Sequence, residues 1–153
     1  SIRMINAGFK VGLIPEAFVY HKRRTSFAQF YKQTYNFGKG RIDIYCLYPK
    51  ELKPVHALPA VFVLGLAFLL MIDVINLLTM DEIYFLHILG LIGNSFLAIY
   101  TILLFLHALV STKSLKVAFL SVIAAYTQLI AYGSGFLSQY AHKFITNKKA
   151  AKN

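Results

Sequence analysis

Three apolar stretches in the second part of the chain constrain its fold more than any other feature. They cover residues 58–78, 83–110 and 117–137, and each is as long as the roughly 20 residues that a helix needs to cross about 30 Å of hydrocarbon. The chain is 58% hydrophobic and 14% charged, whereas soluble domains average about 45–50% apolar and about 25% charged residues. A soluble enzyme, a disordered tail and a collagen-like fibre are excluded, and we expect a membrane protein.

The positions of lysine and arginine predict how these stretches cross the membrane, because cytoplasmic flanks are enriched in both residues. The basic first half and the loop with Lys113 and Lys116 should be cytoplasmic, and the turn at residues 81–82, which lacks both residue types, should lie outside. This pattern fits two spans. A third crossing would place the basic tail, residues 139–153, outside. The sequence alone leaves open whether residues 117–137 cross the membrane, re-enter it or lie in its interface.

The chain is strongly basic, with 16 Lys and Arg against 6 Asp and Glu and a formal net charge of +10. Residues 1–53 hold ten of the basic residues and three acidic ones, so that segment alone carries +7. A charge of this size indicates an anionic partner, for which phospholipid, nucleic acid and phosphorylated ligands are the usual kinds. The single cysteine, Cys46, excludes a disulfide framework and a thiolate metal cluster.

The first half of the chain has the signals of two helices separated by an extended segment. Residues 1–8 read as the end of a helix closed by its glycine, the residue that most readily takes the left-handed C-cap conformation. Residues 9–14 are predicted to form a short strand. Ser26, with Gln29 three positions later, is a capping-box signature that predicts a helix start. We expect this helix to be amphipathic, to end at residues 38–41 and to lie on the cytoplasmic membrane face.

The densest basic cluster, residues 21–24, has the sequence His-Lys-Arg-Arg and admits two explanations. A lipid patch would gain about 1 kcal/mol per Lys or Arg from anionic headgroups. A phosphate clamp would use the arginine forks to bind phosphate oxygens, and a neutral His21 could ligand a divalent metal. The position of the cluster before a helix start favours the clamp, because the backbone N–H groups there add positive potential.

The other polar residues give no complete catalytic centre. No spacing of serine, histidine and acid groups indicates a nucleophilic triad, and residues 1–53 contain no pair of carboxylates placed to act as acid and base. Asp73 is expected at the membrane interface, and residues 132–136 are expected to allow close helix packing through small side chains. Packing rather than ligand binding is also expected of the three histidines near the ends of the stretches: His56, His87 and His107.

Several short motifs follow one another in an order that resembles the end of the catalytic domain in family 2 glycosyltransferases. Residues 3–10 are similar to the family's helix end "R…GFK", and residues 15–21 to its "P-x-A-x-V-x-H". Residues 21–27 look like "H-x-x-R-x-S-(L/F)", and residues 33–41 like "Q-x-x-R-Y-G-x-G-R". Residues 52–60 and the apolar stretches resemble the membrane region of bacterial, membrane-anchored members. The resemblance covers the whole chain but only about the C-terminal third of such an enzyme.

This resemblance implies a mainly α fold and a division of the chain. Residues 1–24 would be the C-terminal remnant of a GT-A α/β domain, and residues 25–54 an amphipathic interface helix with its linker. Residues 55–138 would form two to three transmembrane helices, followed by the basic tail. The metal-binding Asp-x-Asp motif and the acidic motif with the catalytic base would precede residue 1. We therefore expect no catalytic residue in this chain and no activity from it alone.

The resemblance also assigns candidate binding residues. His21 matches a histidine beside the metal-diphosphate, Arg24 an arginine that holds the donor pyrophosphate, and Gln33 a glutamine that faces the acceptor and diphosphate. Arg41 is a further candidate for the donor site, and a divalent metal, Mg²⁺ or Mn²⁺, is expected in the full-length enzyme. Asn36 stands where the family prefers arginine. Either Arg41 or Arg24 compensates for the lost charge, or the enzyme is not of the processive type, and we favour the second explanation.

The implied reaction is transfer of a sugar, with inversion, from a nucleotide-diphosphate donor to a glycan or lipid-linked acceptor. An upstream Asp would deprotonate the acceptor hydroxyl at the cytoplasmic face of a bacterial inner membrane. The expected partners are membrane lipids, the nucleotide-sugar donor and the acceptor, without nucleic acid. The competing hypothesis is a non-enzymatic module, either a polybasic membrane anchor or a small transporter subunit, in which His21, Arg24 and Gln33 have no special role.

Overall fold

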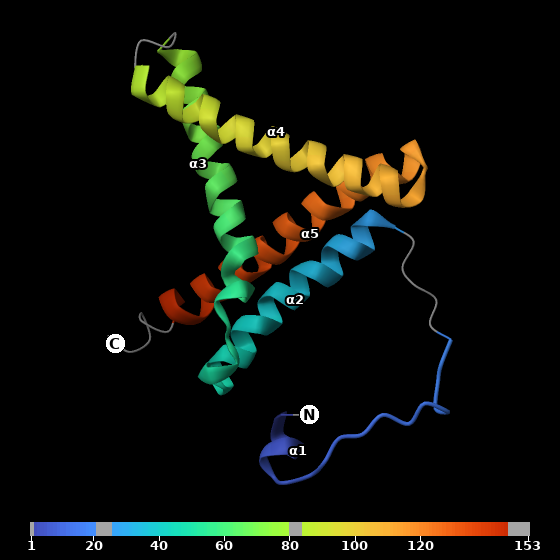
Figure 1. Ribbon diagram of the computed structural model, residues 1–153. Helices are drawn as coiled ribbons and strands as arrows, with labels where there is room; N and C mark the ends of the chain where they lie inside the picture. The colour runs from blue at the N-terminus through green and yellow to red at the C-terminus, as the bar shows by residue number, and fades with distance from the viewer. Residues whose placement is uncertain (1, 21–25, 80–83, 147–153) are drawn as a thin grey trace.

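Helices account for most of the computed structural model, which describes residues 2–20, 26–79 and 84–146 (Figure 1). These residues contain no strand, so the prediction of a mainly α-helical chain is confirmed. Whether residues 1–24 are the remnant of a GT-A domain stays a prediction. Short helical turns at 49–51, 54–57 and 142–146 accompany the longer elements, which are α1 (Ile2–Asn6), α2 (Phe27–Leu47), α3 (Leu58–Leu78), α4 (Tyr84–Thr112) and α5 (Leu115–Ala141).

The N-terminal segment confirms one local prediction and contradicts another. α1 is closed by Gly8, whose φ of +84° is the left-handed conformation expected of a C-cap glycine. The strand predicted at residues 9–14 is wrong. A strand is held by hydrogen bonds to a neighbour, and the described residues offer this segment no such partner; it runs as an exposed chain, with Leu13 91% exposed.

α2 begins where the capping signature predicts and ends later than predicted. Ser26 is the N-cap, and its Oγ accepts the backbone N–H of Gln29 at 3.3 Å. The predicted end at residues 38–41 is wrong, because the helix continues to Leu47. An interior glycine costs a helix about 1 kcal/mol relative to alanine. Gly38 is nevertheless kept in the helix, since it is buried at a contact with α5 that a larger residue would obstruct.

α3, α4 and α5 are each long and apolar enough to cross a membrane, which identifies a membrane protein. α3 coincides with the stretch predicted at 58–78, and α4 and α5 extend the other two stretches by a few residues. Large apolar side chains on all three helices are exposed; Leu77 and Val110, for example, are 79% and 76% exposed. So much exposed apolar surface is stable against lipid rather than water.

The three long helices form the sides of a triangle (Figure 1). α3 and α4 meet where α3 finishes and α4 begins, and Asn94 donates a hydrogen bond to Asp73 there. α5 joins the far end of α4 to the first turns of α3. Rings from the three helices fill the space between them, with centroids 6.0–6.4 Å apart: Phe62, Tyr100 and Tyr126.

α2 lies beside α5 and runs in the same direction (Figure 1). The contacts advance along both helices together, from Tyr35 against Gly135 to the Tyr45 ring 6.2 Å from the Phe144 ring. A small buried core closes the junction of α2, α3 and α5, with one residue from each: Ile42, Ala60 and Phe136. α2 is therefore fixed to the membrane helices rather than to the N-terminal segment.

Candidate functional site

Two of the four predicted site residues lie on α2 and two lie outside the described residues. His21 and Arg24 belong to the segment that the structure does not describe. Gln33 and Arg41 are both half-buried on α2, and their separation of eight residues corresponds to a rise of about 12 Å along the helix. In the part of the chain that is described, neither side chain forms a hydrogen bond or an ion pair.

Arg41 lies at a basic turn between α2 and α3. The backbone N–H of Lys53 donates to Nδ1 of His56 at 3.0 Å, which caps the 54–57 turn. A ring nitrogen that accepts a hydrogen bond carries no proton, so the imidazole is neutral in this arrangement. Arg41 and Lys53 both lie close enough to act electrostatically on His56. The turn thus presents two permanent cations just before the first membrane helix, a charge arrangement suited to phosphate oxygens.

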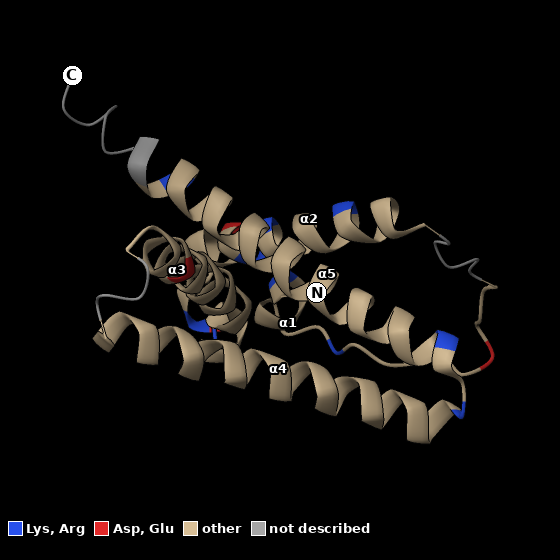
Figure 2. Cartoon of the chain, turned by 90° about the horizontal axis from the view of Figure 1, so that it is seen from above, with Lys and Arg blue, Asp and Glu red and all other residues tan. Residues whose placement is uncertain are grey.

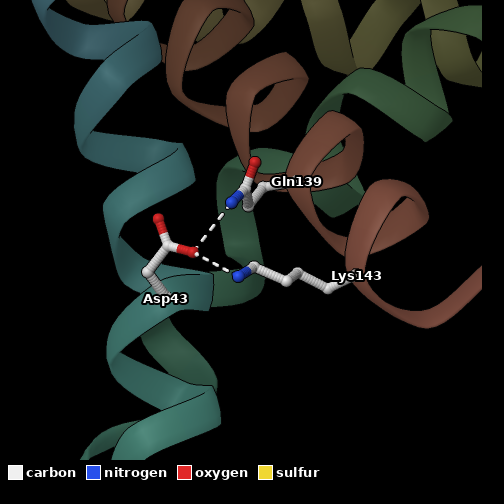
Figure 3. Close-up of polar contacts among 3 residues, drawn as sticks. All are labelled: Asp43, Gln139 and Lys143. Atoms are coloured by element: carbon white, nitrogen blue, oxygen red, sulfur yellow. Dashed lines mark hydrogen bonds and ion pairs between the residues drawn. The ribbon is translucent and has the colours of Figure 1, made fainter. Parts of the chain in front are cut away.

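A polar cluster that the sequence did not reveal holds α2 against α5. Oδ1 of Asp43 accepts a hydrogen bond from Nε2 of Gln139 at 2.7 Å and pairs with Nζ of Lys143 at 3.5 Å (Figure 3). Gln139 and Lys143 are four residues apart, so they occupy the same face of α5. The carboxylate is held by side chains and is about half exposed, and its role is to fix the register of the two helices.

A second polar cluster lies between α3 and α4, at the end of the triangle where these helices meet. Oδ1 of Asp73 accepts from Nδ2 of Asn94 at 3.0 Å, and Nδ2 of Asn76 donates to the carbonyl of Leu86 at 3.2 Å. Asp73, Asn76 and Asn94 line a cleft of about 500 Å³ together with His87. The position of Asp73 at the membrane interface stays a prediction; in the structure it is half-buried and hydrogen-bonded to the facing helix. Asn94 lies in the middle of the apolar stretch 83–110, and the sequence gives no sign of its partner, because a contact between two helices leaves no local signal.

The described residues do not test the divalent metal that the resemblance implies for the full-length enzyme, which stays a prediction. No group of three or more His, Cys, Asp or Glu side chains that could hold a metal ion occurs among them. His21, the predicted metal ligand, lies outside that set, and Cys46 is exposed on α2.

Comparison with family models, with curated proteins and with solved structures found no match for this chain. Its function is therefore inferred from its own residues and geometry.

Proposed function

We propose that this chain is the C-terminal, membrane-bound portion of a family 2 glycosyltransferase. The enzyme would move a sugar from a nucleotide-diphosphate donor to a glycan or lipid-linked acceptor at the cytoplasmic membrane face. The observation that carries the proposal is the course of α2. This helix starts at the capped Ser26, directly after the family-like motifs, carries Gln33 and Arg41, and leads through a basic turn into α3.

In this reaction the bond between the anomeric carbon and the diphosphate oxygen breaks, and a bond from the acceptor oxygen to that carbon forms. The acceptor proton passes to a base outside this chain, and the nucleoside diphosphate leaves with the bonding electrons. Arg41 would stabilise the negative charge on the leaving diphosphate, because fixed cations act most strongly where charge develops. Gln33 would donate or accept a hydrogen bond at the acceptor. His21 and Arg24 would complete the donor side.

The proposed enzyme adds single sugars rather than polymerising them. Asn36 stands where the resembling family prefers arginine, and it is exposed on α2. Arg41 is five residues further on, which places it about 140° around the helix. Arg41 therefore presents its charge on a different side of α2 and does not replace an arginine at residue 36. The loss of that charge supports a non-processive enzyme.

The test uses the full-length protein with its upstream sequence. The reading frame before Ser1 should encode an acidic motif of the type "E-D", and the expressed enzyme should transfer sugar in membranes. His21→Ala, Arg24→Ala and Arg41→Ala should each reduce transfer by at least about 100-fold, the scale at which electrostatic stabilisers of a transition state act. Lys32→Ala is the matched control, because Lys32 is an exposed cation elsewhere on α2; it should retain activity.

The same variants test the non-enzymatic hypothesis. Membrane insertion of each variant is measured by carbonate extraction, and it should be unchanged, because α3 and α4 supply the apolar helices. A chain without an upstream catalytic domain, or equal transfer by wild type and all three variants, would reject the glycosyltransferase. A polybasic anchor would then remain, and its binding to anionic vesicles would fall by a similar amount for Lys32→Ala and Arg41→Ala.

A further inference from the structure

The pairing of α2 with α5 determines how α5 can lie in the membrane. α2 has four charged residues within its 21 positions: Lys32, Lys39, Arg41 and Asp43. A charged residue costs about 2.5–3.5 kcal/mol at the centre of a membrane-spanning helix, so α2 is a surface helix and not a span. α5 runs parallel to α2 from Gly135 to Phe144, with backbone against backbone at Gly135. Because α5 packs along this surface helix, α5 lies in the same plane, parallel to the membrane surface.

The contacts with α3 and α4 place α5 at one end of the helical hairpin. The backbone of Pro59 lies against Gly133, and the Phe62 ring lies 6.0 Å from the Tyr126 ring. These α3 residues belong to its first turns, whereas the α5 residues belong to its middle. The start of α5 follows the end of α4 after two residues, 113–114. α5 therefore closes the open side of the α3–α4 hairpin, from the corner where α4 finishes to the corner where α3 begins (Figure 1).

The charges agree with this placement. α4 contains no Lys, Arg, Asp or Glu, whereas basic residues occur near both ends of α5 and along α2 (Figure 2). Lys113 and Lys116 flank the start of α5, Lys143 follows its end, and three more lysines come later in the sequence. A crossing by α5 would separate these two basic groups by the membrane, against the preference of lysine and arginine for one side. α5 also has the lowest mean hydropathy of the three long helices.

We propose that α2 and α5 form a two-helix layer in the headgroup region of the cytoplasmic leaflet, and that α3 and α4 are the membrane spans. The partner of this layer is an anionic lipid surface. Basic residues near both ends of α5 meet the headgroups, and its exposed apolar side chains enter the acyl boundary, as in other interfacial helices. Leu120, Ile123 and Ile130 form such a stripe, since they are exposed and lie within about a quarter turn of one another. The proposal does not depend on the glycosyltransferase function.

Labelling of single cysteines tests the side of each end of α5. The background is Cys46→Ser, and the probe is a membrane-impermeant maleimide applied to right-side-out and inverted membranes. Lys116→Cys and His142→Cys place thiols at exposed positions near the two ends of α5. Both should react from the same, cytoplasmic side. The control pair is Tyr84→Cys and Thr112→Cys, at the ends of α4, which should react from opposite sides. Reaction of Lys116→Cys and His142→Cys from opposite sides would overturn the proposal.

A measurement of depth in the bilayer tests the placement of α5 independently. Spin labels are placed at Leu120, Ile123 and Ile130, and their exposure to oxygen and to a water-soluble nickel complex is compared in bilayers. A spanning α5 would change depth by about 15 Å between the first and last of these labels, whereas an in-plane α5 keeps them within a few ångströms. Labels at Ile92, Ile99 and Leu103, an exposed stripe on α4, should show the full gradient. A gradient of equal size on α5 would contradict the in-plane layer.

Discussion

Gly38 of α2 lies with its backbone directly against the backbone carbonyl of Tyr132 in α5. A side chain at residue 38 would overlap that carbonyl oxygen and approach the backbone N–H of Phe136, so the two helices can touch here only through glycine. Gly135 makes the reciprocal approach, with its open side against the carbonyl of Tyr35. Two glycines on facing helices thus set the distance between α2 and α5.

Gly38→Ala should destabilise the contact between α2 and α5, because the methyl group meets backbone atoms that cannot move aside as a flexible side chain can. Overpacking of this kind costs about 1–3 kcal/mol, which thermal unfolding in detergent would show as a lower Tm. The matched control is Gly40→Ala, since a methyl group at Gly40 meets nothing within 4 Å. Alanine is the better helix former there by up to about 1 kcal/mol, so this variant should be as stable as wild type or more stable. Equal Tm values for the two variants would refute the close-packing argument.

The same glycine shows where prediction from the sequence stops. Apolar length predicted α3, α4 and α5, and the Ser26 cap predicted the start of α2, because these signals are contained in the segments themselves. The end of α2 was predicted wrongly because residues 38–41 contain two glycines, and a glycine that breaks a helix looks the same in sequence as one that packs against another helix. The partner of Gly38 lies almost a hundred residues away.

Only part of the candidate site could be predicted from the sequence. Arg41 and Gln33 were found through a motif; Gln33 lies on α2 as expected, whereas Arg41 was expected where the helix ends and lies within it. The neighbours of Arg41, Lys53 and His56, come together through the turn that ends α2, and the Asp43 cluster through the register between α2 and α5. No spacing within one helix indicates the contacts between Asp43 and α5, since they depend on how separate helices pack.

The Asp43 cluster predicts that loss of Gln139 and loss of Lys143 lower the Tm by different amounts. Gln139→Leu removes the hydrogen bond at 2.7 Å, whereas Lys143→Ala removes an ion pair at 3.5 Å whose groups are 39% and 48% exposed. Ion pairs this exposed contribute about 0.2–1 kcal/mol, and a hydrogen bond to a charged group contributes about 1.5–3 kcal/mol before screening. Gln139→Leu should therefore lower the Tm more than Lys143→Ala, and 0.5 M salt should weaken only the Lys143 contribution. A larger loss for Lys143→Ala would show that the ion pair dominates.

The hydrogen bond between α4 and α5 predicts that removal of one hydroxyl oxygen lowers the stability of the protein. The Thr101 hydroxyl donates to the carbonyl of Leu97 at 2.8 Å, so the Tyr126 hydroxyl must donate to Thr101 across their 2.6 Å contact. Tyr126→Phe keeps the ring packing and should lower the free energy of unfolding by about 0.5–1.5 kcal/mol. Tyr140→Phe is the control, because the Tyr140 hydroxyl has no hydrogen bond to the described residues. Indistinguishable unfolding of these two variants would exclude a contribution from the Thr101 contact.

The Asp73–Asn94 contact predicts that the α3–α4 hairpin depends on one polar pair. Asn94→Leu would leave the Asp73 carboxylate without its amide donor between two apolar helices, a situation that membrane helices avoid. Interhelical hydrogen bonds in membranes contribute about 0.6 kcal/mol on average and up to about 1.7 kcal/mol, so the loss should fall in that range when unfolding is followed in bicelles. Ser95→Leu is the matched control, since Ser95 is adjacent, exposed and without a hydrogen bond in the described chain. Asp73→Asn should retain most of the stability, because its amide oxygen can still accept from Asn94. A loss from Ser95→Leu as large as that from Asn94→Leu would mean that added bulk, and not the missing amide, weakens the hairpin.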